Sequence, residues 1–129
     1  MEVQLVERIY RAIADRDLQS LLELLHPECV ITQDARLPWG GRFTGHAGFG
    51  ELSTRLLDKI DSAVTVEAVF EADGAIYQCG RTRGYVRSSG VAFDIAEVHR
   101  WVIHNGQAVE AHFAVDTPAM LDALSADGA

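Results

Sequence analysis

The chain has 129 residues, 48% of them hydrophobic and 23% charged, which is enough for one globular domain with its own core. Its 19 acidic and 11 basic side chains give a formal net charge of −8, which argues against nucleic acid or an anionic membrane as partner. Cys29 and Cys79 are isolated, and no apolar run approaches the ~18 residues of a membrane span. We expect a single cytoplasmic domain over residues 1–129.

The first 26 residues predict two helices joined by a short turn. Asp17 stands where a helix N-cap belongs, and Pro27 ends the second helix because the residue before a proline is disfavoured in the α region. The first helix, over residues 2–14, has its apolar residues at helical spacing: Val3, Val6, Ile9, Tyr10 and Ile13.

The next segment predicts a short strand, a loop and a third helix. Residues 29–32 are β-prone, whereas residues 34–45 hold Pro38 and several glycines and therefore predict an irregular loop. A helix is expected over residues 46–60, although Gly48 and Gly50 weaken it.

The second half predicts four strands and a closing helix. The strands cover residues 63–72, 75–87, 91–104 and 107–115, and the helix covers residues 117–124 with Pro118 in its first turn. Helices followed by an antiparallel meander indicate an α+β domain with its helices on one sheet face. Several strands are apolar on both faces, so we expect a homodimer through the sheet. The turns between the strands are Asp73-Gly74, Ser88-Ser89-Gly90 and Asn105-Gly106.

Four short strings occur in an order that is typical of one superfamily. With the order of elements, they resemble SnoaL-like and nuclear transport factor 2-like proteins, relatives of ketosteroid isomerase and polyketide cyclases, over nearly the whole chain. Arg16 stands where the first string usually has glycine. The strings are Ala14-Asp15-Arg16-Asp17-Leu18, residues 37–46, Val98-His99-Arg100-Trp101 before Asn105-Gly106, and Val115-Asp116-Thr117.

The resemblance implies a cone-shaped, curved antiparallel sheet with helices packed on its concave face around an apolar pocket. It also implies a small apolar or amphipathic ligand, and neither a metal nor a cofactor. Members of the superfamily differ in activity, so the fold alone does not decide the function.

The last predicted hairpin brings two histidines together. Counting back from a two-residue turn at Asn105-Gly106 places His99 opposite His112. Periodicity alone makes this histidine face solvent-exposed and the valine-rich face core, whereas the resemblance implies the reverse, because a pocket acid of ketosteroid isomerase falls near His99. Glu97, His99 and Trp101 then share the face with Glu110, His112, Ala114 and Asp116.

In the pocket interpretation, His99 would exchange protons near neutral pH with the help of Asp34 or His112. Other roles remain open, since Asp34 is equally typical of a turn and a metal held by His99, His112 and a carboxylate lacks supporting ligand spacing. The residues expected to bind ligand are Tyr10, Trp39, Trp101 and Asp116.

Two of these side chains have plainer interpretations, in which Trp39 pins its loop to the core and Tyr10 is ordinary core. Alignment on Asp17 places the base and tyrosine of ketosteroid isomerase at Gln33 and Ile9, each one residue early, which speaks against steroid isomerisation.

Three functions follow. The first is a cofactor-independent isomerase, cyclase or hydratase acting on a small, largely apolar metabolite. The second is a non-catalytic, ligand-binding homodimer with the same pocket. The third is a protein-interaction module, which needs an exposed apolar patch.

Overall fold

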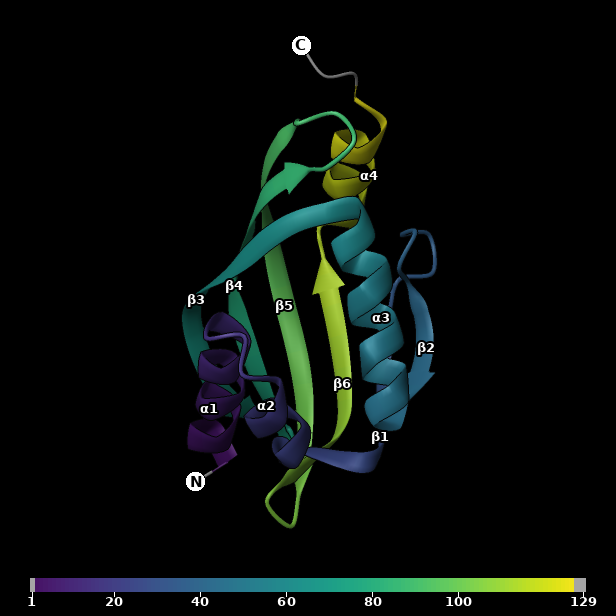
Figure 1. Ribbon diagram of the computed structural model, residues 1–129. Helices are drawn as coiled ribbons and strands as arrows, with labels where there is room; N and C mark the ends of the chain where they lie inside the picture. The colour runs from purple at the N-terminus through teal and green to yellow at the C-terminus, as the bar shows by residue number, and fades with distance from the viewer. Residues whose placement is uncertain (1, 127–129) are drawn as a thin grey trace.

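The structure is a computed structural model, and it describes residues 2–126 (Figure 1). Within this range the chain forms four helices and six strands, and the predicted α+β class is confirmed. The helices are α1 (Glu2–Ala14), α2 (Leu18–Leu24), α3 (Gly45–Lys59) and α4 (Thr117–Ser125). The strands are β1 (Leu25–Gln33), β2 (Gly41–Thr44), β3 (Ile60–Ala72), β4 (Ala75–Val86), β5 (Ala92–His104) and β6 (Gln107–Val115).

The strands form one curved sheet in the order β2-β1-β6-β5-β4-β3 (Figure 1). Neighbouring strands are antiparallel except β1 and β6, which run parallel, so the sheet is mixed and not wholly antiparallel as predicted. The parallel pair joins two strands that α3 and four further strands separate in sequence, and parallel neighbours need such a long crossover.

The helices lie on the concave face of the sheet. Helix α1 contacts β3 and β4, and α3 contacts β1 and β2, while β5 and β6 run between them (Figure 1). The apolar stripe of α1 enters the core, where Val6 and Ile9 are completely buried. None of the helices in residues 2–126 combines the length and hydrophobicity required to cross a bilayer.

The predicted boundaries are wrong around residues 25–45. Helix α2 ends at Leu24, and β1 runs through Pro27 because its pairing with β6 is irregular between Leu25 and Val30, where a missing N–H is tolerated. The segment predicted as a loop contains β2, a four-residue edge strand that pairs with the end of β1. The glycines of this segment are typical of a loop, and for that reason β2 was not predicted.

Two predicted turns are confirmed by their backbone angles. Asn105 and Gly106 have φ values of 50° and 77°, as a two-residue turn with positive φ at both positions requires. Arg16 also has a positive φ, 55°, at the joint between α1 and α2, where the related string usually has glycine.

Candidate functional site

The inward face of β5 carries the candidate chemistry. Side chains along β5 alternate between buried and exposed, and Glu97, His99 and Trp101 are on the buried side. His99 is 8% exposed, whereas Val98 is 43% exposed on the opposite face. The prediction that His99 points inward is therefore confirmed, and the interpretation based on periodicity alone is wrong because the helices cover the histidine face.

The predicted pairing of His99 with His112 is wrong. The register of β5 and β6 shifts between Val102 and Ile103, so His99 lies opposite Phe113 and His112 lies opposite Arg100. A β-bulge places one extra residue in one strand and turns every later side chain to the other face, which counting from the turn cannot detect. His112 is exposed on the convex face, where its Nδ1 is 2.7 Å from Thr32 Oγ1.

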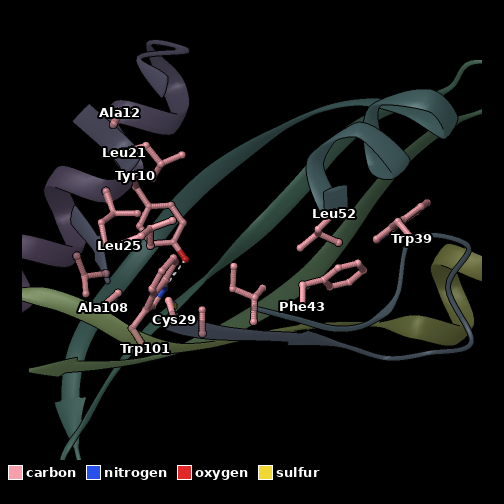
Figure 2. Close-up of a cluster of buried hydrophobic side chains, with 14 of the residues drawn as sticks. Tyr10, Ala12, Leu21, Leu25, Cys29, Trp39, Phe43, Leu52, Trp101 and Ala108 are labelled. Atoms are coloured by element: carbon pink, nitrogen blue, oxygen red, sulfur yellow. Dashed lines mark hydrogen bonds between the residues drawn. The ribbon is translucent and has the colours of Figure 1, made fainter. Parts of the chain in front are cut away.

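A chain of hydrogen bonds links helix α1 to β5. The indole N–H of Trp101 donates to the Tyr10 hydroxyl oxygen at 2.9 Å (Figure 2). That hydroxyl lies 2.6 Å from His99 Nδ1. The indole can only donate, so the Tyr10 oxygen accepts from it and its own O–H is free to donate to His99. The ring proton of a neutral His99 then resides on Nε2.

The other ring nitrogen of His99 faces a buried carboxyl group. His99 Nε2 is 3.4 Å from Glu97 Oε2, and the side-chain amide of Gln78 donates to the same oxygen at 2.5 Å. Gln78 is completely buried on β4, directly across from His99. Gly80 leaves room for this group, because a Cβ there would lie only 2.5 Å from Gln78 Oε1. We call Tyr10, Gln78, Glu97, His99 and Trp101 the buried polar network.

Burial sets the protonation of the network. It raises the pKa of Glu97 to about 7, against the opposing hydrogen bond from Gln78. It lowers the pKa of His99 to about 3, with a smaller contribution from the charge of His112. Burial also holds the pKa of the Tyr10 hydroxyl above its usual range. Near neutral pH, the imidazole and phenol are therefore neutral, and Glu97 is the group that gains and loses a proton.

Asp34 and Asp116 lie outside this network. The Asp34 carboxylate pairs with Arg36 at 2.7 Å and also accepts from its backbone N–H, and these bonds lower the pKa of Asp34 to about 2. Asp116 is exposed and caps α4 by accepting from the N–H of Ala119. In its local contacts Asp34 matches its structural alternative, a turn former, and Asp116 acts as an N-cap.

Trp39 is buried at a distance from the network. Its side chain is 1% exposed, and Figure 2 shows it on the side of the core cluster that holds Leu52 and Phe43, away from Tyr10 and Trp101. This matches the interpretation in which Trp39 pins its loop to the core. Tyr10 is core, as in its plainer interpretation, and its hydroxyl is also part of the buried polar network.

Sequence reasoning did not select three polar residues of the concave face. Glu97 was recognised on the histidine face but given no role. Gln33 aligned with the base of ketosteroid isomerase but was also given no role, and no signal in the sequence indicated that Gln78 would be buried. Among the described residues, three buried side-chain atoms have no hydrogen-bond partner: Gln33 Oε1, Trp39 Nε1 and Gln78 Oε1.

Two surface hollows lie elsewhere on the molecule. One of about 270 Å³ borders Pro38, Lys59 and Leu124, and one of about 510 Å³ borders Arg8 and Asp17. Neither is lined by the buried polar network, so the apolar pocket over His99 stays a prediction.

Within residues 2–126, no three His, Cys, Asp or Glu side chains are grouped closely enough to hold a metal ion. Half-buried apolar side chains that pack against the core include Phe49, Leu56, Phe113 and Val115.

This arrangement defines a small α+β domain with polar groups buried on the concave face of its sheet. Residues 6–111 match the SnoaL-like domain family, and the chain belongs to that family. No curated protein matches the sequence.

Solved structures show the same fold. A nuclear transport factor 2-like protein of unknown function from Burkholderia pseudomallei is 25% identical, with a TM-score of 0.87 over 95% of this chain and 96% of that chain. TerC, co-crystallised with polyporic acid, is 20% identical, with a TM-score of 0.86 over 96% and 98%. A protein from Jannaschia that is named as a SnoaL-like polyketide cyclase is 19% identical, with a TM-score of 0.83 over 96% and 91%.

Proposed function

We propose that this chain is a cofactor-independent enzyme of the isomerase or cyclase kind, and that it moves a proton on a small, largely apolar molecule. One observation carries the proposal: a carboxyl group with a pKa near 7 lies beside a neutral imidazole on the concave face of the sheet. Groups with such perturbed pKa values cluster at functional sites.

Glu97 is the proton acceptor in this proposal. As a carboxylate it takes a proton from an acidic C–H beside a carbonyl group of the substrate, and as the acid it returns that proton at a second position. A pKa near the working pH favours both steps. Gln78 donates to the carboxylate and orients it, His99 Nε2 lies 3.4 Å from the same oxygen, and Tyr10 and Trp101 fix the tautomer of His99.

The names of two structural neighbours support a small organic ligand for this chain, but they do not identify the compound. One structural neighbour is named as a polyketide cyclase, and another was crystallised with polyporic acid. Both names indicate small organic ligands, and the half-buried Phe113 and Val115 would give such a ligand an apolar surface beside Glu97 and His99.

Proton exchange in heavy water tests the proposal without knowledge of the substrate. The protein is incubated in D₂O with a panel of cyclic diketones and aryl ketones, and deuterium uptake is followed by mass spectrometry. We expect the wild type to accelerate exchange for at least one compound, and Glu97→Gln and His99→Ala to remove that acceleration. His112→Ala is the matched control and should exchange at the wild-type rate. Equal rates for wild type and Glu97→Gln would refute the role of Glu97.

A second function, ligand binding without catalysis, is favoured by one feature. Both ring nitrogens of His99 already face protein groups, Tyr10 and Glu97, so the imidazole has no free nitrogen for a substrate. In that case a compound of the panel would raise the melting temperature of the wild type without deuterium uptake or conversion.

The proposal includes a homodimer through the convex face of the sheet. Phe70 and Val98 are 44% and 43% exposed there, and the Phe70 ring stacks on Tyr77 with centroids 5.7 Å apart. Exposed apolar side chains that share a sheet face are typical of a subunit contact. A single domain over residues 1–129 and a cytoplasmic location also stay predictions.

A further inference from the structure

We propose that Gln33 is a specificity residue of this site, and that its side chain accepts a hydrogen bond from a hydroxyl group on a ring-shaped ligand lying against Phe113. The inference rests on the proposed function and adds the chemical class of the ligand, an aromatic or enolic alcohol.

Gln33 is buried at a cost in stability. Its side chain is at the end of β1, is 6% exposed, and its Oε1 atom has no partner among the described residues. A buried carboxamide oxygen that has lost its hydrogen bonds to water destabilises the folded state unless a donor replaces them. A ligand hydroxyl group that donates to Gln33 Oε1 would supply the missing hydrogen bond.

The register of the sheet places Gln33 close to the network. Strands β1 and β6 run parallel with Thr32 beside His112, so one residue further along Gln33 is beside Phe113. Phe113 is directly opposite His99 on β5, and their rings are 4.8 Å apart. Side chains at paired positions share a face. Gln33 and His99 therefore flank Phe113 on the concave face.

The spacing of this row limits the ligand. Neighbouring strands are ~4.8 Å apart, so the backbones at Gln33 and His99 are roughly 10 Å apart, with the half-buried Phe113 ring between them. A flat ligand of one or two fused rings is comparable in width to this row, and in this proposal it packs on Phe113. A carboxamide does not ionise, so Gln33 can bind a hydroxyl group but cannot act as a base.

The structural alternative is that Gln33 supports the loop that follows it. Trp39 Nε1, in the same loop, is also buried without a partner, and a water molecule between Gln33 and Trp39 would give both a structural role. The two roles predict opposite effects of removing the carboxamide.

Thermal unfolding without ligand separates these roles. We expect Gln33→Leu to be at least as stable as the wild type, because the substitution removes an unpaired polar group from an apolar setting. Gln107→Leu is the matched control, since the Gln107 amide donates to the Glu23 carbonyl oxygen at 3.2 Å and its loss should lower the melting temperature slightly. A melting temperature for Gln33→Leu well below that of Gln107→Leu would overturn the inference.

Binding of two matched probes tests the ligand class. By calorimetry we expect wild type and Gln107→Leu to bind a naphthalenediol about tenfold more tightly than its monomethyl ether, since one hydrogen bond to a buried acceptor is lost. Gln33→Leu should bind both compounds alike. Equal affinities in the wild type, or no binding of either probe, would overturn the inference about Gln33. The deuterium-exchange assay judges Glu97 separately, so failure of one proposal is distinguishable from failure of the other.

Discussion

The Tyr10 hydroxyl and His99 Nδ1 are 2.6 Å apart, although 89 positions separate the two residues in the sequence. The contact joins the first helix to the fifth strand and fixes which nitrogen of the imidazole carries the proton. It therefore links the packing of α1 on the sheet to the chemistry of Glu97, because His99 lies between them.

Removing the Tyr10 hydroxyl should destabilise the protein without leaving a large cavity. Tyr10→Phe leaves the Trp101 indole N–H and His99 Nδ1 without their shared partner in a buried setting. We expect a loss of about 1–3 kcal/mol in the free energy of unfolding, measured with urea. The control is Tyr85→Phe, because Tyr85 is 44% exposed and its hydroxyl donates to half-buried Asp61 at the surface. Equal stability of the two variants would contradict the prediction.

The fold could be predicted because its signals are local. Helical spacing in residues 2–14 and the Asn105-Gly106 turn each follow from a few neighbouring residues, and both are confirmed. Strand β2 escaped prediction because it is short and rich in signals typical of a loop. The parallel pairing of β1 with β6 was not predicted, because it depends on contacts between residues that are far apart in the sequence.

The site could be predicted only in part, for a related reason. His99 was selected through a family resemblance, and its inward direction is confirmed. His112 was then placed beside it by counting across a hairpin, and a single bulge between Val102 and Ile103 moved it to the other face. Gln78 meets the concave face through pairings with distant strands, which the sequence does not display, and Gln33 was marked only by its alignment with the base of ketosteroid isomerase.

The raised pKa of Glu97 predicts an unusual pH dependence of stability. The folded state binds this proton more tightly than the unfolded state, so the stabilisation is complete below the unfolded pKa of 4.5 and is lost as the pH rises through about 7. Glu97→Gln removes this loss. Relative to wild type, the variant should gain about 3 kcal/mol in unfolding free energy between pH 4.5 and about pH 8, measured by urea titration at each pH.

His99 and Asp34 must be separated from this effect. The lowered pKa of His99 stabilises the fold above about pH 6.5, and this is lost as the pH falls toward 3, so it opposes Glu97 over part of the range. The difference between wild type and Glu97→Gln cancels it. Asp34→Asn is the control, because the pKa of Asp34 is lowered to about 2 and its contribution is constant above its unfolded value. A difference for Glu97→Gln that does not change with pH would refute the raised pKa.

Two glycines should respond in opposite directions to alanine. A Cβ at Gly80 would overlap the backbone oxygen of Thr65 and crowd the Gln78 side chain, so we expect Gly80→Ala to cost at least about 2 kcal/mol. Gly50 is exposed in α3 with nothing near its Cβ position, and Gly50→Ala should stabilise by about 0.5–1 kcal/mol. Thermal unfolding measures both, and a stable Gly80→Ala protein would show that the strand can shift there.

The proposed dimer makes the convex face sensitive to charge. Val98 is 43% exposed at the centre of that face, directly opposite Cys79 on β4, and Val98→Glu would place a carboxylate inside the subunit contact. Burying an unpaired charge costs several kcal/mol, so we expect the variant to be a monomer at concentrations where the wild type is a dimer. Sedimentation equilibrium measures this. Leu18→Glu is the control, because Leu18 is the more exposed residue, at 57%, but lies on α2 away from this face, and it should leave the dimer intact. If the Val98→Glu protein stays dimeric, the subunit contact lies on another surface of the domain.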